Sequence, residues 1–308
     1  MPEKKLPNDA NGLFLTDSGL ETSLIFHDRL DLPLFASFVL LKTAEGRSRL
    51  KRYFAHHAEV AAAHGAGFVW KSVTWRASSD WGDKLGYSAR LLAEANRESI
   101  DLMREVAAGF RTTNIFSGNI GPHGDGYVAD AAMSADAAAD YHARQVEVFA
   151  EAECDLVSAF TMTHTAEAIG VVRAAIRHDM PCVISFTVET DGRLPSGESL
   201  AQAIERTDAE TGGHPSYYMI NCAPVALRGR SGARCGLDGS DRRCARQCLG
   251  PFASGTERFT RSRCRRSGSI RRRLCAAAVS VAAPACTRRL LRHRRSACGG
   301  NRHGLPAA

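Results

Sequence analysis

Residues 155–188 read DLVSAFTMTHTAEAIGVVRAAIRHDMPCVISFTV and contain one complete strand–helix–strand unit. The segments 155–160 and 182–188 are short apolar runs of the kind that form buried strands. Between them, residues 165–177 place apolar side chains at helical spacing. Two strands joined by a helix of this length favour a parallel pair, with the helix packed against one face of the sheet.

The same alternation extends along the chain on both sides of this unit. The apolar pattern predicts six strands, at residues 12–16, 68–73, 114–117, 155–160, 182–188 and 217–221. It predicts helices at residues 47–63, 87–110, 165–177 and 200–207, and a further helix that begins after the N-cap Ser134. An open doubly wound sheet and a closed (β/α)8 barrel both fit this order.

The residues that follow the strands favour the barrel. The first strand leads into DSGLE at residues 17–21, which is not the GxGxxG turn of a dinucleotide-binding fold. Polar or small residues recur at the strand ends: Asp17, Lys71, Gly118, Asn119, Thr161, Thr187, Glu189, Asn221 and Cys222. In a barrel these ends meet at one mouth, where active sites lie. We therefore expect an α/β fold, an incomplete (β/α)8 TIM barrel with about six visible units.

Spacing alone leaves the role of each residue at this mouth open. Asp17 could bind a substrate amine or cap the following helix. Lys71 could be a reactive amine or a member of a salt bridge, and Cys222 a small buried side chain or a ligand. Four histidines lack metal-ligand spacing and are expected at the surface: His27, His56, His57 and His64.

Charge divides the 308 residues into two parts. Residues 1–223 carry 20 basic and 30 acidic side chains, whereas residues 224–308 carry 20 arginines, no lysine and only 3 acidic side chains. The second part also holds seven of the ten cysteines, at scattered spacing that is weak evidence for a metal site. We expect a barrel domain over 1–223 and a mostly disordered, Arg- and Cys-rich tail over 224–308.

Four motifs in the first part resemble the homocysteine S-methyltransferase family. They are LTDSGLET at residues 15–22, GNIGPHGD at 118–125, ISFTV at 184–188 with DGRLPSG at 191–197, and MINC at 219–222. Their order and spacing agree with the family over nearly all of residues 12–223. The resemblance implies a (β/α)8 barrel that transfers a methyl group from a small donor, such as a sulfonium or a betaine, to the sulfur of homocysteine.

The resemblance also implies roles for three residues. Cys222 would be one of three cysteine ligands to Zn²⁺, which keeps the substrate sulfur deprotonated. Asp17 would hold the amino group of homocysteine, and Asn221 would shape the same pocket. The expected partners are homocysteine, or a related thiol or selenol, and a methyl donor. No apolar run is long enough to span a membrane and no signal peptide is recognisable, so a cytoplasmic location is expected.

The chain departs from the family in two places. Many members carry a glutamate at the end of the fourth strand, whereas residues 158–163 here read SAFTMT. An acceptor other than homocysteine is therefore an alternative. The family also takes its other two zinc ligands from a GGCCGT motif, and no adjacent cysteine pair occurs in this chain.

A shift of reading frame explains the second departure. If translation starts one nucleotide later in each codon, APVAL at residues 223–227 becomes compatible with HPSHF, ARQCL at 245–249 with RANAS, and RRLLRHR at 288–294 with GGCCGTD. All three resemble family motifs, in family order. We therefore expect the tail after about Ala223 to be translated out of frame, and the chain as written to be inactive. A barrel remnant whose Arg-rich tail binds nucleic acid is the weaker alternative.

Overall fold

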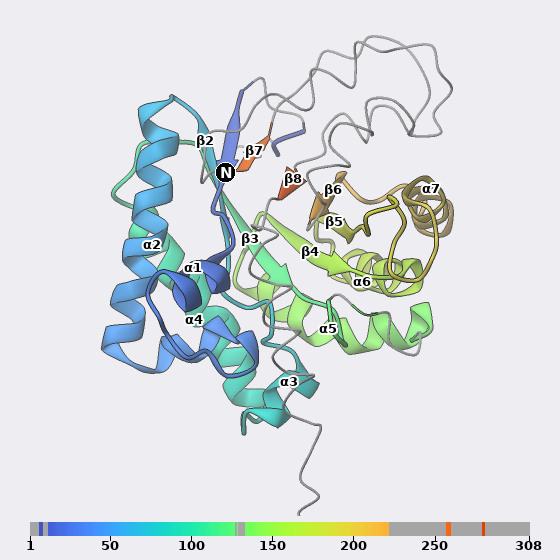
Figure 1. The fold of residues 1–308 in the computed structure, drawn as a ribbon, viewed down its shortest axis with the longest axis horizontal. Coiled ribbons are helices and arrows are strands. Elements are labelled where there is room, and N and C mark those ends of the chain that lie inside the picture. The colour runs from blue at the N-terminus through green and yellow to red at the C-terminus, as the bar shows by residue number, and fades with distance from the viewer. Residues whose placement is uncertain are drawn as a thin grey trace, which may run out of the picture.

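Six parallel strands form the centre of the protein in the computed structural model, which describes residues 6–8, 12–126, 128, 133–221, 257–259 and 279–280. The strands follow one another across the sheet in chain order: β1 (Phe14–Thr16), β2 (Gly67–Lys71), β3 (Asn114–Ile120), β4 (Leu156–Met162), β5 (Cys182–Thr187) and β6 (Tyr217–Asn221). Each coincides with a strand expected from the sequence. The sheet curls into part of a barrel (Figure 1), which confirms the α/β class and the incomplete barrel.

Helices connect the strands and lie along the outer side of the sheet, where Figure 1 shows α2, α4, α5 and α6. In chain order the helices are α1 (Leu20–Phe26), α2 (Ala44–Ala63), α3 (Ser79–Lys84), α4 (Ala89–Ala107), α5 (Ala135–Glu151), α6 (Thr165–Arg177) and α7 (Leu200–Thr211). Two 3₁₀ segments, η1 (Pro33–Phe35) and η2 (Ser37–Lys42), precede α2. Ser134 caps α5, as expected, by accepting a hydrogen bond from the backbone N–H of Ala137.

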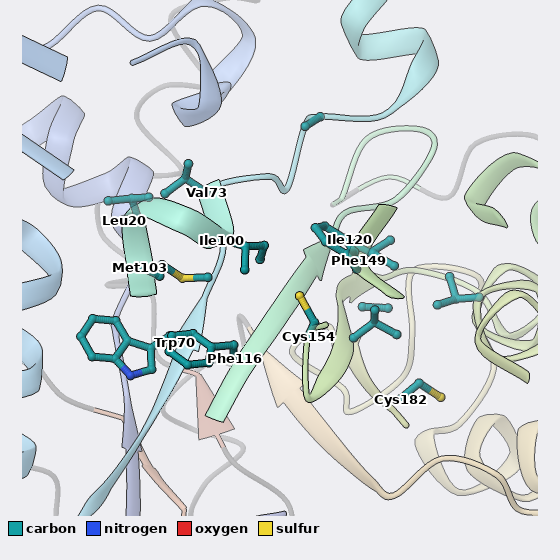
Figure 2. Close-up of a cluster of buried hydrophobic side chains, with 14 of the residues drawn as sticks. Leu20, Trp70, Val73, Ile100, Met103, Phe116, Ile120, Phe149, Cys154 and Cys182 are labelled. Carbon is teal, nitrogen blue, oxygen red and sulfur yellow. The ribbon is translucent and has the colours of Figure 1, made fainter. Parts of the chain in front are cut away.

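Alternation along the strands creates two apolar layers, one on each face of the sheet. The outer layer packs strand residues such as Trp70 and Phe116 against helix residues such as Ile100, Met103 and Phe149 (Figure 2). The inner layer contains the alternate strand residues: Phe14, Val69, Ile115, Leu156, Phe160, Val183, Tyr217 and Met219. A sheet that buries side chains on both faces is what a barrel requires.

Two short strands from the tail extend the sheet at its edges. β7 (Glu257–Phe259) pairs antiparallel with β1, and β8 (Val279–Ser280) pairs parallel with β6. These five residues have regular structure, because the edges of β1 and β6 offer backbone hydrogen-bonding groups. The rest of the tail, and the expected domain boundary at residue 223, lie outside the described residues. Within the described part of the chain, no helix is long and apolar enough to cross a membrane.

Candidate functional site

A polar layer lies on the inner face of the sheet, toward the carboxyl ends of the strands. Each of its members follows an inner apolar residue by two positions and so faces the same side: Thr16, Lys71, Ser117, Ser158, Ser185 and Asn221. Neighbouring strands share hydrogen bonds here, because the hydroxyls of Ser117 and Ser158 lie 2.7 Å apart. The inner face is therefore apolar at one end and polar at the end where barrel enzymes bind substrates.

Asp17 follows β1 directly and is buried beside this layer. The hydroxyl of Thr16 lies 3.2 Å from Oδ1 of Asp17, and the hydroxyl of Tyr53 lies 3.2 Å from Oδ2. The Nζ atom of Lys71 lies 3.7 Å from Oδ1. Asp17 does not cap α1, since the N-cap of that helix is Gly19 and makes no side-chain cap hydrogen bond. The structure thus removes one of the two roles that spacing had left open for Asp17.

Lys71 ends β2 and extends along the polar layer. Its side chain is only 11% exposed, and its ammonium lies 4.7 Å from the centre of the Phe160 ring. An ammonium at this depth needs a counter-charge, which Asp17 provides. Of the two roles considered for Lys71, the salt bridge is the one observed.

Glu21, on α1, adds a second carboxyl group to this region. The hydroxyl of Ser37 donates a 2.6 Å hydrogen bond to Oε1 of Glu21. Burial raises the pKa of Glu21, and the nearby carboxylate of Asp17 raises it further, against the opposing effects of the Ser37 hydrogen bond and the Lys71 charge.

Tyr53 and His57, on α2, hold the turn after β1. Tyr53 donates its hydroxyl to the backbone oxygen of Ser18, and Nε2 of His57 lies 3.1 Å from the Ser18 hydroxyl. His57 is buried, so the expectation that it lies at the surface is wrong. The reason is that His57 occupies the face of α2 that packs on the barrel, where its ring nitrogens find Ser18 and the backbone oxygen of Tyr53.

Asn221, the last residue of β6, is fixed by hydrogen bonds at both ends of its amide. Its Oδ1 accepts from the Ser185 hydroxyl (2.7 Å) and from the backbone N–H of Thr161 (3.0 Å), while its Nδ2 donates to the Thr187 hydroxyl (3.1 Å). Asn221 thereby ties β4, β5 and β6 together at their carboxyl ends.

Thr161 lies within residues 158–163, the stretch that lacks the family's strand-four glutamate. Its φ of 61° is left-handed, which is costly for a β-branched residue. The β4–β5 register shifts between Ala159 and Met162, on either side of it. Two hydrogen bonds hold this strained conformation in place. The backbone N–H of Thr161 donates to Asn221, and Nε1 of Trp75 donates to the Thr161 hydroxyl (2.9 Å).

A buried carboxylate network between α5 and α6 was not expected from the sequence. Glu167 accepts hydrogen bonds from the backbone N–H of His123 (2.7 Å) and from His142 Nε2 (3.0 Å), and its Oε2 lies 3.4 Å from His164 Nε2. Burial opposes ionisation of Glu167, but hydrogen bonds from His142 and His164 outweigh it and lower the pKa. Pro122, Gly124, Asp125 and Thr163 line a small pocket beside this network, together with His123, His164 and Glu167.

The described residues do not form a metal site. No three His, Cys, Asp or Glu side chains are grouped suitably within that part of the chain. The described cysteines, Cys154 and Cys182, precede or begin their strands, at the end opposite the polar layer, and burial raises the pKa of each thiol to about 12. Cys222, the expected zinc ligand, lies outside the described residues, directly after Asn221.

Fold and site together define a barrel of the kind found in enzymes, with polar groups gathered at the carboxyl ends of its strands. The family model for homocysteine S-methyltransferase matches residues 14–230, so this chain belongs to the homocysteine S-methyltransferase family and is a methyltransferase. Homocysteine S-methyltransferase 1 of Brassica oleracea var. italica is 26% identical over 231 residues, and its counterpart in Arabidopsis thaliana is 26% identical over 236 residues. Each alignment covers 69% of both chains.

Solved structures show the same fold. The metallated form of the homocysteine methyltransferase MmuM from Escherichia coli superposes with a TM-score of 0.59 at 20% identity, covering 74% of this chain and 82% of that one. Its oxidized form gives the same TM-score at 19% identity, covering 76% and 83%. The barrel architecture expected from the sequence is therefore shared with an experimentally determined structure.

Proposed function

We propose that this chain's lineage transfers a methyl group from a small sulfonium or betaine donor to the sulfur of homocysteine, giving methionine. The family match supports the reaction class. The observation that carries the proposal is the buried carboxylate of Asp17 at the mouth, where it can accept hydrogen bonds from a substrate ammonium. Asn221, fixed by its three hydrogen bonds, would form the wall of the same pocket next to residue 222.

We also propose Zn²⁺ as the cofactor, with Cys222 as one ligand. When bound, zinc keeps a coordinated thiol deprotonated at neutral pH. The described residues supply no further ligands, and the sequence lacks the adjacent cysteine pair that the family uses. This gap supports the proposal that the tail is read out of frame, because the shifted frame of residues 288–294 is compatible with that pair.

A comparison of two proteins tests these proposals: the chain as given, and the product of a gene shifted by one nucleotide at codon 223. We expect the frame-restored protein to bind one equivalent of zinc and to form methionine from homocysteine with a sulfonium or betaine donor. We expect the chain as given to do neither. Stoichiometric zinc and methyl transfer by the chain as given would overturn the frame proposal.

The acceptor is tested in the same assay, since residues 158–163 contain no acid. If the frame-restored protein methylates another thiol or a selenol but not homocysteine, then homocysteine is not the acceptor. Resequencing the source DNA across the codons for residues 221–228 tests the proposed shift of reading frame. A different number of nucleotides there would restore the frame that gives the family motifs.

A further inference from the structure

Lys71 places a positive charge where the family resemblance assigns only the anion Asp17. The side chain belongs to the polar layer, is almost entirely buried and lies against the Phe160 ring. A buried ammonium is costly unless its surroundings compensate it, so a cation at the mouth of a barrel is expected to have a task.

The contact between Lys71 and Asp17 is an ion pair and not a hydrogen bond. The 3.7 Å between Nζ and Oδ1 exceeds the usual range for an N–H···O bond. The two oxygens of Asp17 instead lie 3.2 Å from the neutral hydroxyls of Thr16 and Tyr53, whose closer acceptors are the backbone oxygens of Val69 and Ser18. Asp17 thus has two neutral hydroxyls and the cation of Lys71 beside it.

We propose that Asp17 and Lys71 together bind the zwitterionic head of an α-amino acid acceptor, with Lys71 binding the α-carboxylate and Asp17 the α-ammonium. This inference rests on the proposed function. The two charges of an α-amino acid are attached to one carbon, so a receptor for both needs opposite charges side by side, as these two side chains provide. Lys71 is then a positioning residue that determines specificity for carboxylate-bearing thiols.

Ligands that lack one charge separate this role from a purely structural salt bridge. Binding of L-homocysteine, 3-amino-1-propanethiol (no carboxylate) and 4-sulfanylbutanoic acid (no ammonium) is measured calorimetrically with the full chain under reducing conditions. We expect Lys71→Met to weaken binding of the two carboxylate ligands by roughly 10- to 100-fold and to leave the aminothiol unchanged. Lys71→Arg should restore most of the affinity, and Lys51→Met, which removes a salt-bridged lysine on α2, should change nothing.

The Asp17→Asn variant should show the mirror pattern, with weaker binding of homocysteine and the aminothiol only. Lys71→Met leaves Asp17 without its cation, so circular dichroism is used to check that this variant folds. The double variant Lys71→Met/Asp17→Asn removes both charges at once and so leaves no unpaired charge. Equal losses for all three ligands in folded Lys71→Met, or no loss, would overturn the proposal, as would failure of the full chain to bind any of them. If the charge-specific pattern appears but no methyl transfer is found in the separate assay, the proposed reaction fails and this assignment stands.

Discussion

Glu167 shows how a single side chain can link two helices and a loop. Its carboxylate is buried and accepts hydrogen bonds from His123 and His142, with His164 close by. Replacing it with glutamine removes the charge and turns an amide N–H₂ toward existing donors. We expect Glu167→Gln to lower the free energy of unfolding at pH 7 by about 3 kcal/mol.

The pH dependence of this effect follows from the lowered pKa of Glu167. The stabilisation is present above the unfolded-state pKa of about 4.3 and is lost as the pH falls toward the folded-state pKa. Urea unfolding of the parent protein and of Glu167→Gln between pH 3 and pH 7 measures how the difference in their free energy of unfolding changes with pH. Glu151→Gln, at an exposed ion pair on α5, is the control and should be nearly neutral. A difference that grows on acidification would contradict the assignment.

Glu21 is expected to behave in the opposite way, because burial raises its pKa. Folding then disfavours the ionised carboxylate of Glu21, which lowers the free energy of unfolding. This loss of stability is absent below the unfolded-state pKa, grows as the pH rises to the folded-state pKa and stays constant above it. Glu21→Gln keeps an acceptor for Ser37 and removes the charge. The variant should therefore be at least as stable as the parent at pH 7 and lose this advantage at pH 4. Unfolding curves at the two pH values decide the sign.

The positions of candidate site residues could be predicted from the sequence where those residues end or directly follow a strand. Asp17, Lys71 and Asn221 all lie at the polar ends of strands, as expected. The Glu167 network could not be predicted, since His142, His164 and His123 come from a helix, a helix cap and a loop that only the folded chain brings together. The roles of Asp17 and Asn221 in binding homocysteine, and of Cys222 in binding zinc, remain predictions.

At the scale of elements, α5 and α6 pack closely because Gly170 has no side chain. A Cβ at Gly170 would overlap the Cβ of Ala138 and lie 2.8 Å from the backbone oxygen of Ala135. We expect Gly170→Ala to cost about 1–3 kcal/mol of stability, through forced separation of the helices. Gly109→Ala is the control, because its Cβ would meet only one atom, at 3.5 Å. Thermal unfolding of both variants tests the contrast, and equal effects would contradict it.

Strand positions were easier to predict than the ends of helices. The six strands are apolar runs whose neighbours in sequence become neighbours in the sheet, so local pattern was sufficient. α7 runs to Thr211, four residues beyond the expected end, and stops where Gly212 adopts a left-handed φ of 62°. α1, α3 and the two 3₁₀ segments were not expected, because they are too short for apolar periodicity to show.

At the scale of the whole molecule, only three residues of β7 and two of β8 flank the six parallel strands in the described part of the chain. Two complete strand–helix units would cover far more of the inner apolar layer. We therefore expect the frame-restored protein to be more stable than the chain as given by roughly 5 kcal/mol or more, and to bind less of a hydrophobic dye. Urea unfolding and dye fluorescence at equal concentration measure this, and equal values would contradict it.

The order of strands across the sheet has a consequence for synthesis on the ribosome. Because β1 to β6 are arranged as they occur in the chain, each new strand can pair with the one completed just before it. In a closed eight-stranded barrel, the contact between the eighth strand and β1 would span the whole domain, and contacts of such long sequence separation form late. A nucleotide gained or lost near codon 223 therefore leaves the information for the first six units intact and alters only the step that closes the barrel.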